Sequence, residues 1–130
     1  MERTHIDLPG KTLPPSMPRW PFSDAVRAGD TLYLSGRLGL DPVTHKPPAD
    51  AADEARQLLD DVRRVLETAG MTMDDLVMVT IFAPDVSHFA AFNAVYMSYF
   101  SGPMPARAFI GSGPLLFGAR FEVTAIAAAR

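Results

Sequence analysis

Residues 105–110 read PARAFI, and the interpretation of the whole chain starts from this stretch. Pro105 fixes its own φ angle and pushes Met104 toward an extended conformation, so no helix crosses this point. The chain therefore leaves the proline turn as a strand with Arg107 at its head. A guanidinium is a rigid fork of donors that binds a carboxylate through two hydrogen bonds. Arg107 is thus a candidate carboxylate-binding residue, and a surface ion pair with Asp or Glu is the plain alternative.

The composition is that of one globular domain, which we assign to residues 1–130. The chain is 48% hydrophobic and 21% charged, as is usual for globular proteins. Its net charge of −3 supplies no positive field for phosphates, so we expect no nucleic-acid partner. There are no cysteines, and the three histidines lack metal-ligand spacing. We therefore expect neither a thiol nucleophile nor a metal site.

No stretch is long and apolar enough to span a membrane, and no signal peptide is visible at the N-terminus. We therefore expect a cytoplasmic protein without a membrane partner. The first 22 residues are predicted to form an extended arm with at most one edge strand near residues 3–8, and Trp20 and Phe22 are expected to anchor its end. The prolines that indicate the arm are Pro9, Pro14, Pro15, Pro18 and Pro21.

A hairpin is predicted after the arm, because residues 25–28 and 31–35 flank a Gly-Asp turn. Gly36 follows directly, and a glycine at a strand end indicates a bulge or a close approach by another group. We interpret Arg37, the next residue, as a solvated loop residue rather than a second anion site.

The first helix is predicted after Asp50, a plausible N-cap, and is expected to end at Gly70. Asp60 and Arg64 are four residues apart and are expected to pair on its outer surface. One apolar stripe recurs at helical spacing: Ala55, Leu58, Leu59, Val62, Leu66 and Ala69.

Residues 76–82 are almost entirely apolar and predict a central strand buried on both faces. Asp85 is expected to cap a second helix, and residues 120–128 predict a last strand. The aromatic residues of the second helix are expected to form a core stripe: Phe89, Phe92, Tyr96 and Tyr99 or Phe100.

The resulting order of strands and helices is typical of an α+β domain with a mixed sheet. Two helices cover only one face of such a sheet, and the other face still carries apolar side chains such as Ile126. A monomer would expose them, so we infer an oligomer built through the uncovered face.

Five segments in order resemble the Rid family of YjgF-type proteins, which are often described as L-PSP endoribonucleases. They are Tyr33-Leu34-Ser35-Gly36, Ala55-Arg56-Gln57 with residues 60–70, residues 89–96 with Asn93, Pro105-Ala106-Arg107, and Phe121-Glu122-Val123 through Ala127. The resemblance implies a chorismate-mutase-like α+β fold. It also implies a homotrimer whose sheets line a central barrel and whose active sites lie between subunits.

The same resemblance implies hydrolysis of reactive 2-imino acids to 2-keto acids and ammonia, without metal or cofactor. Arg107 stands where the family's arginine holds the substrate carboxylate. Glu122 stands where the family's glutamate positions or deprotonates the attacking water, although it is equally expected to be a structural partner of Arg107 or Arg120. Ser35 and Gly36 match residues near the mouth of the pocket.

Three further residues are assigned to substrate binding: Phe22, Asn93 and Phe109. A structural hydrogen bond is the alternative role for Asn93. Two of the three are also departures from the family pattern, since Phe22 replaces a pocket tyrosine and Phe109 a frequent cysteine. Arg37 replaces a common glutamine, and residues 113–116 replace a Leu-Pro connection.

The apolar replacements imply a bulkier substrate, or a weaker form of the standard activity. The missing tyrosine hydroxyl motivates an alternative function, a non-catalytic protein that binds or senses a small carboxylate. The endoribonuclease activity of the family's older name is disfavoured, because the chain is acidic and lacks a basic, aromatic-rich strip.

Overall fold

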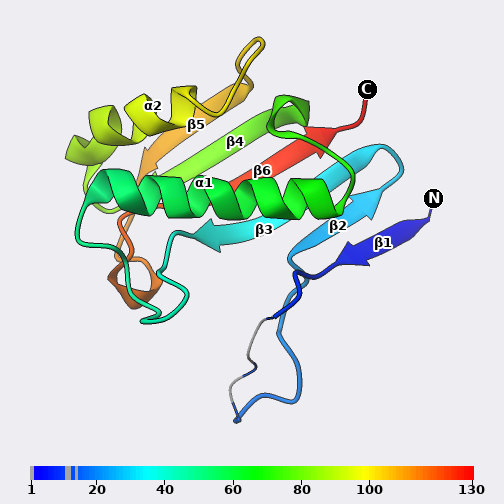
Figure 1. The fold of residues 1–130 in the computed structure, drawn as a ribbon, viewed down its shortest axis with the longest axis horizontal. Helices are drawn as coiled ribbons and strands as arrows, with labels where there is room; N and C mark the ends of the chain where they lie inside the picture. The colour runs from blue at the N-terminus through cyan, green and yellow to red at the C-terminus, as the bar shows by residue number, and fades with distance from the viewer. Residues whose placement is uncertain (1, 11–12, 14) are drawn as a thin grey trace.

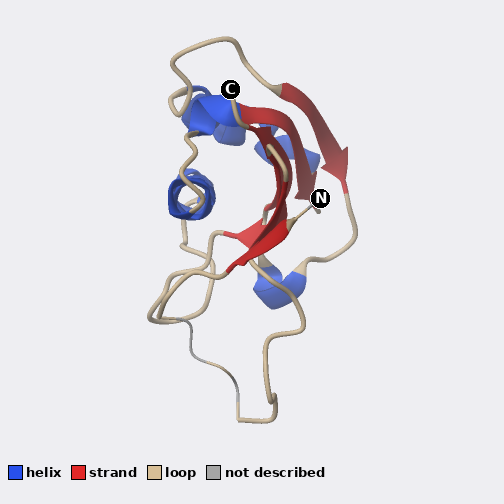
Figure 2. Ribbon diagram, turned by 90° about the vertical axis from the view of Figure 1, so that its right-hand side faces the viewer, coloured by secondary structure: helices blue, strands red, loops and turns tan. Residues whose placement is uncertain are grey.

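The computed structural model describes residues 2–10, 13 and 15–130, so Pro14 of the predicted arm lies outside the described residues. Six strands form one mixed sheet, and two α-helices lie on the same side of it (Figures 1 and 2). The expected α+β class is confirmed. The helices are α1 (Ala51–Thr68) and α2 (Phe89–Met97).

The sheet has the strand order β1-β2-β3-β6-β4-β5. Only β4 and β5 are parallel, and every other neighbouring pair is antiparallel. The parallel pair requires a crossover, which α2 provides. The strands are β1 (Arg3–Ile6), β2 (Ala25–Ala28), β3 (Thr31–Leu38), β4 (Leu76–Ala83), β5 (Ala106–Gly111) and β6 (Glu122–Ala128).

The covered face of the sheet packs against both helices and forms the core. Its strand residues alternate with those of the open face, as the period of two requires. The buried residues of the covered face include Leu32, Leu34, Val79, Ile81, Val123, Ala125 and Ala127. The open face carries Tyr33, Met78, Thr80, Phe82, Glu122, Thr124 and Ile126.

In β4 the prediction of burial on both faces is wrong for the single chain. Val79 and Ile81 are buried, whereas Met78, Thr80 and Phe82 are only partly buried. Neither α1 nor α2 covers this side of the sheet, because both lie on the opposite side (Figure 2). The apolar composition of this strand therefore reflects an open face that is incompletely buried in one chain.

The first helix follows its predicted pattern, with Asp50 as N-cap and Ala55 through Leu66 buried at helical spacing. The predicted Asp60–Arg64 pair is wrong. Arg64 instead contacts Asp61 at 3.4 Å, and Asp60 pairs with Arg63 at 2.9 Å. Both pairs are three residues apart, a spacing that also places side chains on one surface of a helix.

Asp85 caps a short 3-10 turn (Val86–His88) that precedes α2, and its carboxylate accepts the backbone N–H of Ser87 at 2.9 Å. Phe92 and Tyr96 are buried as predicted. Phe89, however, is 46% exposed, because it lies at the first turn beyond the main core.

The arm forms the predicted edge strand, β1, which pairs with β2. Trp20 packs against Phe22 with ring centroids 6.0 Å apart. The two predicted anchors of the arm are thus in contact, although Phe22 remains 47% exposed in one chain.

Candidate functional site

Arg107 lies in β5, which forms one edge of the sheet, and it points to the covered face. It is in register with the buried Val79 of the parallel strand β4. The guanidinium carbon lies 5.5, 5.0 and 5.9 Å from the ring centroids of Phe89, Tyr96 and Phe109. Contacts of a cation with aromatic faces are favourable, so the three rings hold this charge in place.

The polar partner of Arg107 is Asn93, whose side-chain oxygen accepts a hydrogen bond from Nη1 at 2.7 Å. Within the described part of the chain, no carboxylate pairs with this arginine. The surface ion pair considered as the alternative is therefore not found there. An amide oxygen does not neutralise a guanidinium, and the remaining N–H groups are available to an anion.

A hollow of about 290 Å³ adjoins this arginine. Its floor includes Tyr96, whose hydroxyl is buried without a hydrogen-bond partner among the described residues. Burial raises the pKa of Tyr96 to about 12, although the charge of Arg107 opposes the shift. The hollow is lined by Asn93, Tyr96, Met97, Met104, Pro105 and Arg107.

Glu122 belongs to a second cluster, on the open face. It lies opposite Leu38 of β3 and Phe82 of β4. A Cβ atom at Gly36 would collide with the carboxylate of Glu122, so any larger residue there must displace that carboxylate. Gly36 lies at a register shift between Leu34 and Arg37, which confirms the predicted bulge. The glycine is not at the strand end, because β3 continues to Leu38, and the group that approaches it is the side chain of Glu122.

Ser35 adjoins the same cluster and ties it to the end of the arm. Its hydroxyl donates to the carbonyl of Ser23 at 2.5 Å, and its backbone N–H donates to the carbonyl of Asp24 at 3.0 Å. Phe22 is the next residue along the arm. Ser35, Gly36, Glu122 and the arm end are therefore neighbours.

One chain does not bring all the predicted residues together. Arg107, Asn93 and Phe109 gather at the β5 edge on the covered face, whereas Glu122 and Gly36 lie at the open face. Neither structural ion pair considered for Glu122 is found within the described residues. Arg120 pairs instead with Glu54, at 2.8 Å.

Glu54 is a polar residue that the sequence analysis missed. It is fully buried and accepts hydrogen bonds from the backbone N–H groups of Arg120 and Phe121 at 2.7 and 3.4 Å. Helical spacing could have predicted the burial of Glu54, because Glu54 and Leu58 are four residues apart and share the buried side of α1. The carboxylate holds the start of β6, and hence the backbone that leads into Glu122.

The interpretation of Arg37 as a solvated residue is wrong. Its side chain is 9% exposed and forms ion pairs with Asp24 and Asp61, both at 2.6 Å. The bulge explains the error, because one extra residue shifts the alternation and places Arg37 opposite Val123 of the covered face. Burial alone would lower the pKa of Arg37, but hydrogen bonds and charges from Asp61 and Asp24 raise it.

No group of three or more His, Cys, Asp or Glu side chains in the described part of the chain is arranged to hold a metal ion. The helices described here also include none with the length and apolar character needed to cross a bilayer.

Comparison with known proteins places these features in a family. The model of the family described as Endoribonuclease L-PSP matches residues 14–129. The 2-iminobutanoate/2-iminopropanoate deaminase of Mus musculus is 37% identical over 108 residues, which are 82% of this chain and 80% of the mouse protein.

Solved structures agree with this result. The YjgF gene product of E. coli superposes with a TM-score of 0.79 at 35% identity, over 85% of this chain and 89% of that one. E. coli TdcF with bound serine gives a TM-score of 0.81 at 30% identity, over 86% of this chain and 91% of TdcF. The chain therefore belongs to the Endoribonuclease L-PSP family, the Rid and YjgF-type proteins that its sequence resembles.

Proposed function

We propose that this protein hydrolyses reactive 2-imino acids to 2-keto acids and ammonia, in a pocket formed between subunits of a homotrimer. The observation that carries the proposal is the guanidinium of Arg107, which aromatic rings and an amide hold without a carboxylate among the described residues. The name of the mouse relative and the serine bound to TdcF support a small amino- or imino-carboxylate as ligand.

In this mechanism Arg107 binds the substrate carboxylate through its free N–H groups. Glu122 accepts a proton from water as the water oxygen bonds to the imine carbon. Glu122 then returns its proton to the nitrogen of the tetrahedral adduct. The C–N bond breaks with release of ammonia, and the hydroxyl of the adduct gives its proton to the Glu122 carboxylate as the C=O bond of the 2-keto acid forms. A protonated imine is already a strong electrophile, so positioning it beside the water is the main task of the site.

The trimer is proposed because the two halves of the site lie on different faces of one sheet. Arg107 of one subunit meets Glu122 of a neighbour only if the β5 edge of the first reaches the open face of the second. Such an arrangement also covers Tyr33 and Ile126 of the open face, which a single chain leaves exposed or only partly buried. Phe22, Ser35 and Gly36 then wall the pocket on the Glu122 side, and Phe109 on the Arg107 side.

The test uses freshly generated 2-iminobutanoate and a bulkier apolar imine, with release of keto acid and ammonia followed against buffer. We expect acceleration by the wild-type protein and near-complete loss in Arg107→Ala and Glu122→Gln. Arg63→Ala is the matched control, because Arg63 is an exposed helix residue whose contacts are Asp60 and the Tyr99 ring rather than Arg107 or Glu122. A wild-type protein no faster than buffer with any imine would contradict the proposal.

A second candidate function is binding of a small carboxylate without turnover. It is favoured by Phe22, which provides no hydroxyl at the position where the family pattern has tyrosine. Calorimetry with 2-oxobutanoate separates the two functions, since binding that depends on Arg107 without imine hydrolysis identifies a sensor.

A further inference from the structure

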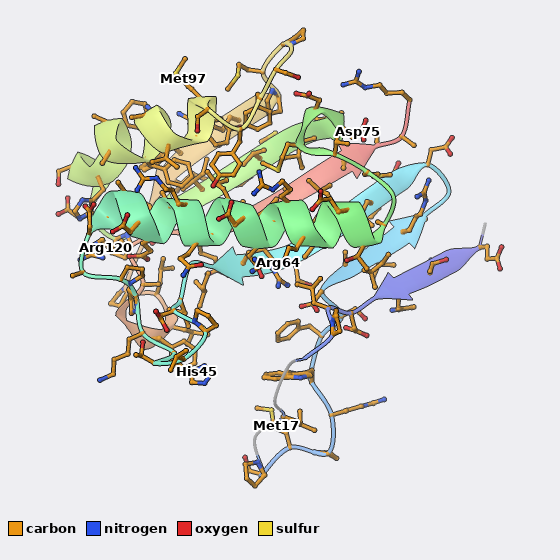
Figure 3. All side chains as sticks on the ribbon, viewed as in Figure 1. Met17, His45, Arg64, Asp75, Met97 and Arg120 are labelled. Carbon is orange, nitrogen blue, oxygen red and sulfur yellow. The ribbon has the colours of Figure 1, made fainter. Side chains whose placement is uncertain are left out.

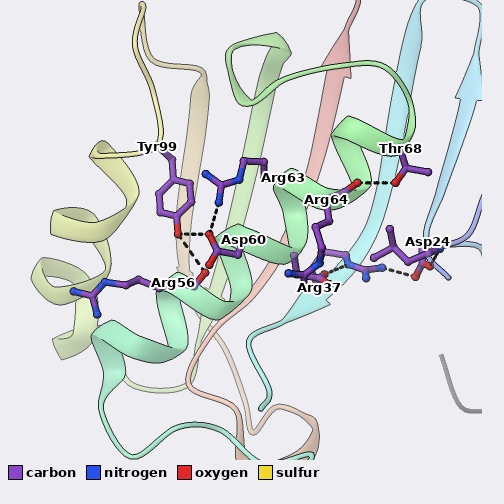
Figure 4. A network of polar contacts seen from close by, with 10 residues as sticks. Asp24, Arg37, Arg56, Asp60, Arg63, Arg64, Thr68 and Tyr99 are labelled. Carbon is purple, nitrogen blue, oxygen red and sulfur yellow. Dashed lines mark hydrogen bonds and ion pairs between the residues drawn. The ribbon is translucent and has the colours of Figure 1, made fainter. Parts of the chain in front are cut away.

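Arg37 is the centre of a buried ionic network between helix α1 and the arm (Figure 4). Its Nε atom lies 2.6 Å from Oδ2 of Asp61 on α1, and its Nη1 atom lies 2.6 Å from Oδ1 of Asp24. Asp24 is 1% exposed and Asp61 18%. The two bonds leave opposite sides of one planar fork, a geometry that guanidinium provides and ammonium does not.

Asp24, which Arg37 holds in place, is hydrogen-bonded in turn to the N-terminal arm. Its Oδ2 atom accepts the backbone N–H of Leu8 at 2.7 Å, and its own backbone N–H donates to Asp7 at 3.3 Å. Asp24 also precedes β2 directly and therefore joins the arm to the sheet. An arginine on β3 thus fixes the position of residues that lie far from it in the sequence.

The segment held by Asp24 is the one that adjoins the Glu122 cluster. The carbonyl of Ser23 accepts the hydroxyl of Ser35, and the hydroxyl of Ser23 lies 3.0 Å from Nδ1 of His5. Phe22 precedes Ser23 and packs on Trp20. The placement of Phe22 therefore depends on residues 23 and 24, and through them on Arg37.

We propose that Arg37 is a positioning residue that fixes Asp24 and thereby sets Phe22 and Ser23 against Ser35 and Gly36. The glutamine common at this position in the family pattern is neutral and would not supply the ion pair that Arg37 makes with the buried Asp24. In this chain, Arg37 and the position of the arm are therefore linked through Asp24. The consequence for substrate choice rests on the proposed function, whereas the placement of the arm does not.

The first experiment needs no substrate, because Trp20 is the single tryptophan of the chain and lies in the arm. Acrylamide quenching of Trp20 fluorescence is compared in wild type, Arg37→Met and Asp61→Asn. We expect stronger quenching and a red-shifted emission in Arg37→Met, since Asp24 loses the arginine that fixes its side chain at the end of the arm. Asp61→Asn keeps the Arg37–Asp24 bond and should leave Trp20 close to wild type.

This contrast isolates the Asp24 side of the network, because Arg37→Met removes both ion pairs of the arginine and Asp61→Asn removes only the one with Asp61. Equal changes in the two variants, or an unchanged Trp20 in a folded Arg37→Met, would overturn the proposal. If Arg37→Met does not fold, Arg37→Lys replaces it, and we expect intermediate quenching because lysine keeps the charge but reaches one carboxylate. Wild-type quenching in Arg37→Lys would count equally against the proposal.

The second experiment measures selectivity between imines. If Phe22 walls the pocket, Arg37→Met should lower kcat/KM for a bulky apolar imine about tenfold more than for 2-iminobutanoate. An equal loss of kcat/KM for both imines would contradict the role of Phe22 in selectivity. The placement of the arm would then be tested by the quenching experiment alone. An inactive wild-type protein would contradict the proposed function while the quenching comparison still tests Arg37.

Discussion

The guanidinium of Arg107 is held in a defined orientation by its neighbours. Three aromatic faces and one amide orient it, so its planar shape matters as much as its charge. Arg107→Lys keeps the charge but loses both the stacking and the two-donor fork. We expect kcat/KM for 2-iminobutanoate to fall about 10- to 100-fold, the value of one charge-assisted hydrogen bond. Steady-state kinetics with Arg63→Lys as control measures the effect, and wild-type kinetics in Arg107→Lys would refute it.

Two tyrosines near α2 differ in how their hydroxyls are satisfied. The hydroxyl of Tyr99 donates to Asp60 at 2.7 Å, whereas that of Tyr96 has no partner among the described residues. Tyr99→Phe should therefore lower the free energy of unfolding by about 1 kcal/mol. Tyr96→Phe should leave it unchanged or raise it by up to about 1 kcal/mol. Urea unfolding of the two variants tests this, and a larger loss in Tyr96→Phe would point to a partner of that hydroxyl.

The same two tyrosines make stability depend on alkaline pH. Burial raises the pKa of Tyr96 to about 12, and burial followed by the hydrogen bond and charge of Asp60 does the same for Tyr99. The unfolded chain releases these protons near pH 10, so it is favoured once the pH exceeds that value. We expect stability to fall as the pH rises from about 10 to about 12. Thermal unfolding across this range measures the fall, which should be smaller in Tyr96→Phe.

Figure 3 shows the side chains on the helices and strands that carry them. The sequence predicts the position of some of these side chains and misses others. The hairpin, the α1 stripe and the inward residues of β6 followed from periodicity alone, because each pattern repeats several times. Arg37 was misplaced since a bulge shifts the alternation by one residue, and the consequence of the predicted bulge was not carried forward. Glu54 was missed because its partners, the N–H groups at the start of β6, are remote in sequence.

Gly36 at the bulge of β3 and Gly39 just after this strand are expected to respond differently to substitution by alanine. A Cβ at Gly36 meets only the flexible end of Glu122, whereas a Cβ at Gly39 meets the backbone of Glu54 and the start of Leu58. Gly36→Ala should cost less than about 1 kcal/mol but displace Glu122 and lower kcat about 10²-fold. Gly39→Ala should cost about 1–3 kcal/mol, because helix backbone cannot move aside. Paired unfolding and kinetic measurements distinguish them, and full activity in a stable Gly36→Ala would remove Glu122 from the mechanism.

At the scale of the whole molecule, two features support the proposed association of subunits. One is the incompletely buried open face of the sheet, and the other is the separation of Arg107 from Glu122. The sequence indicated the uncovered face from the count of helices, and it named both residues through the family resemblance. It gave no indication that they lie on different faces, because the face of each residue depends on strand pairing between distant segments.

Mixing two inactive variants tests whether the site is shared. Arg107→Ala and Glu122→Gln trimers, unfolded together and refolded at equal amounts, should regain roughly a quarter of wild-type activity, since random assembly pairs an intact Arg107 with an intact Glu122 at that frequency. Each variant refolded alone is the control and should stay inactive. No recovery in mixed trimers, verified by size and by retained folding, would place the whole site within one chain.

The contact between Gly36 and the carboxylate of Glu122 has a consequence for how such proteins diverge. The space between positions 36 and 122 holds one acidic group and leaves no room for a methyl group beside it. A lineage that gains a side chain at position 36 must therefore shorten or redirect the residue at 122, and with it the carboxylate that the proposed mechanism uses. We therefore expect the residues at positions 36 and 122 to change together. A descendant that keeps glycine at 36 and glutamate at 122 is expected to keep the ancestral chemistry.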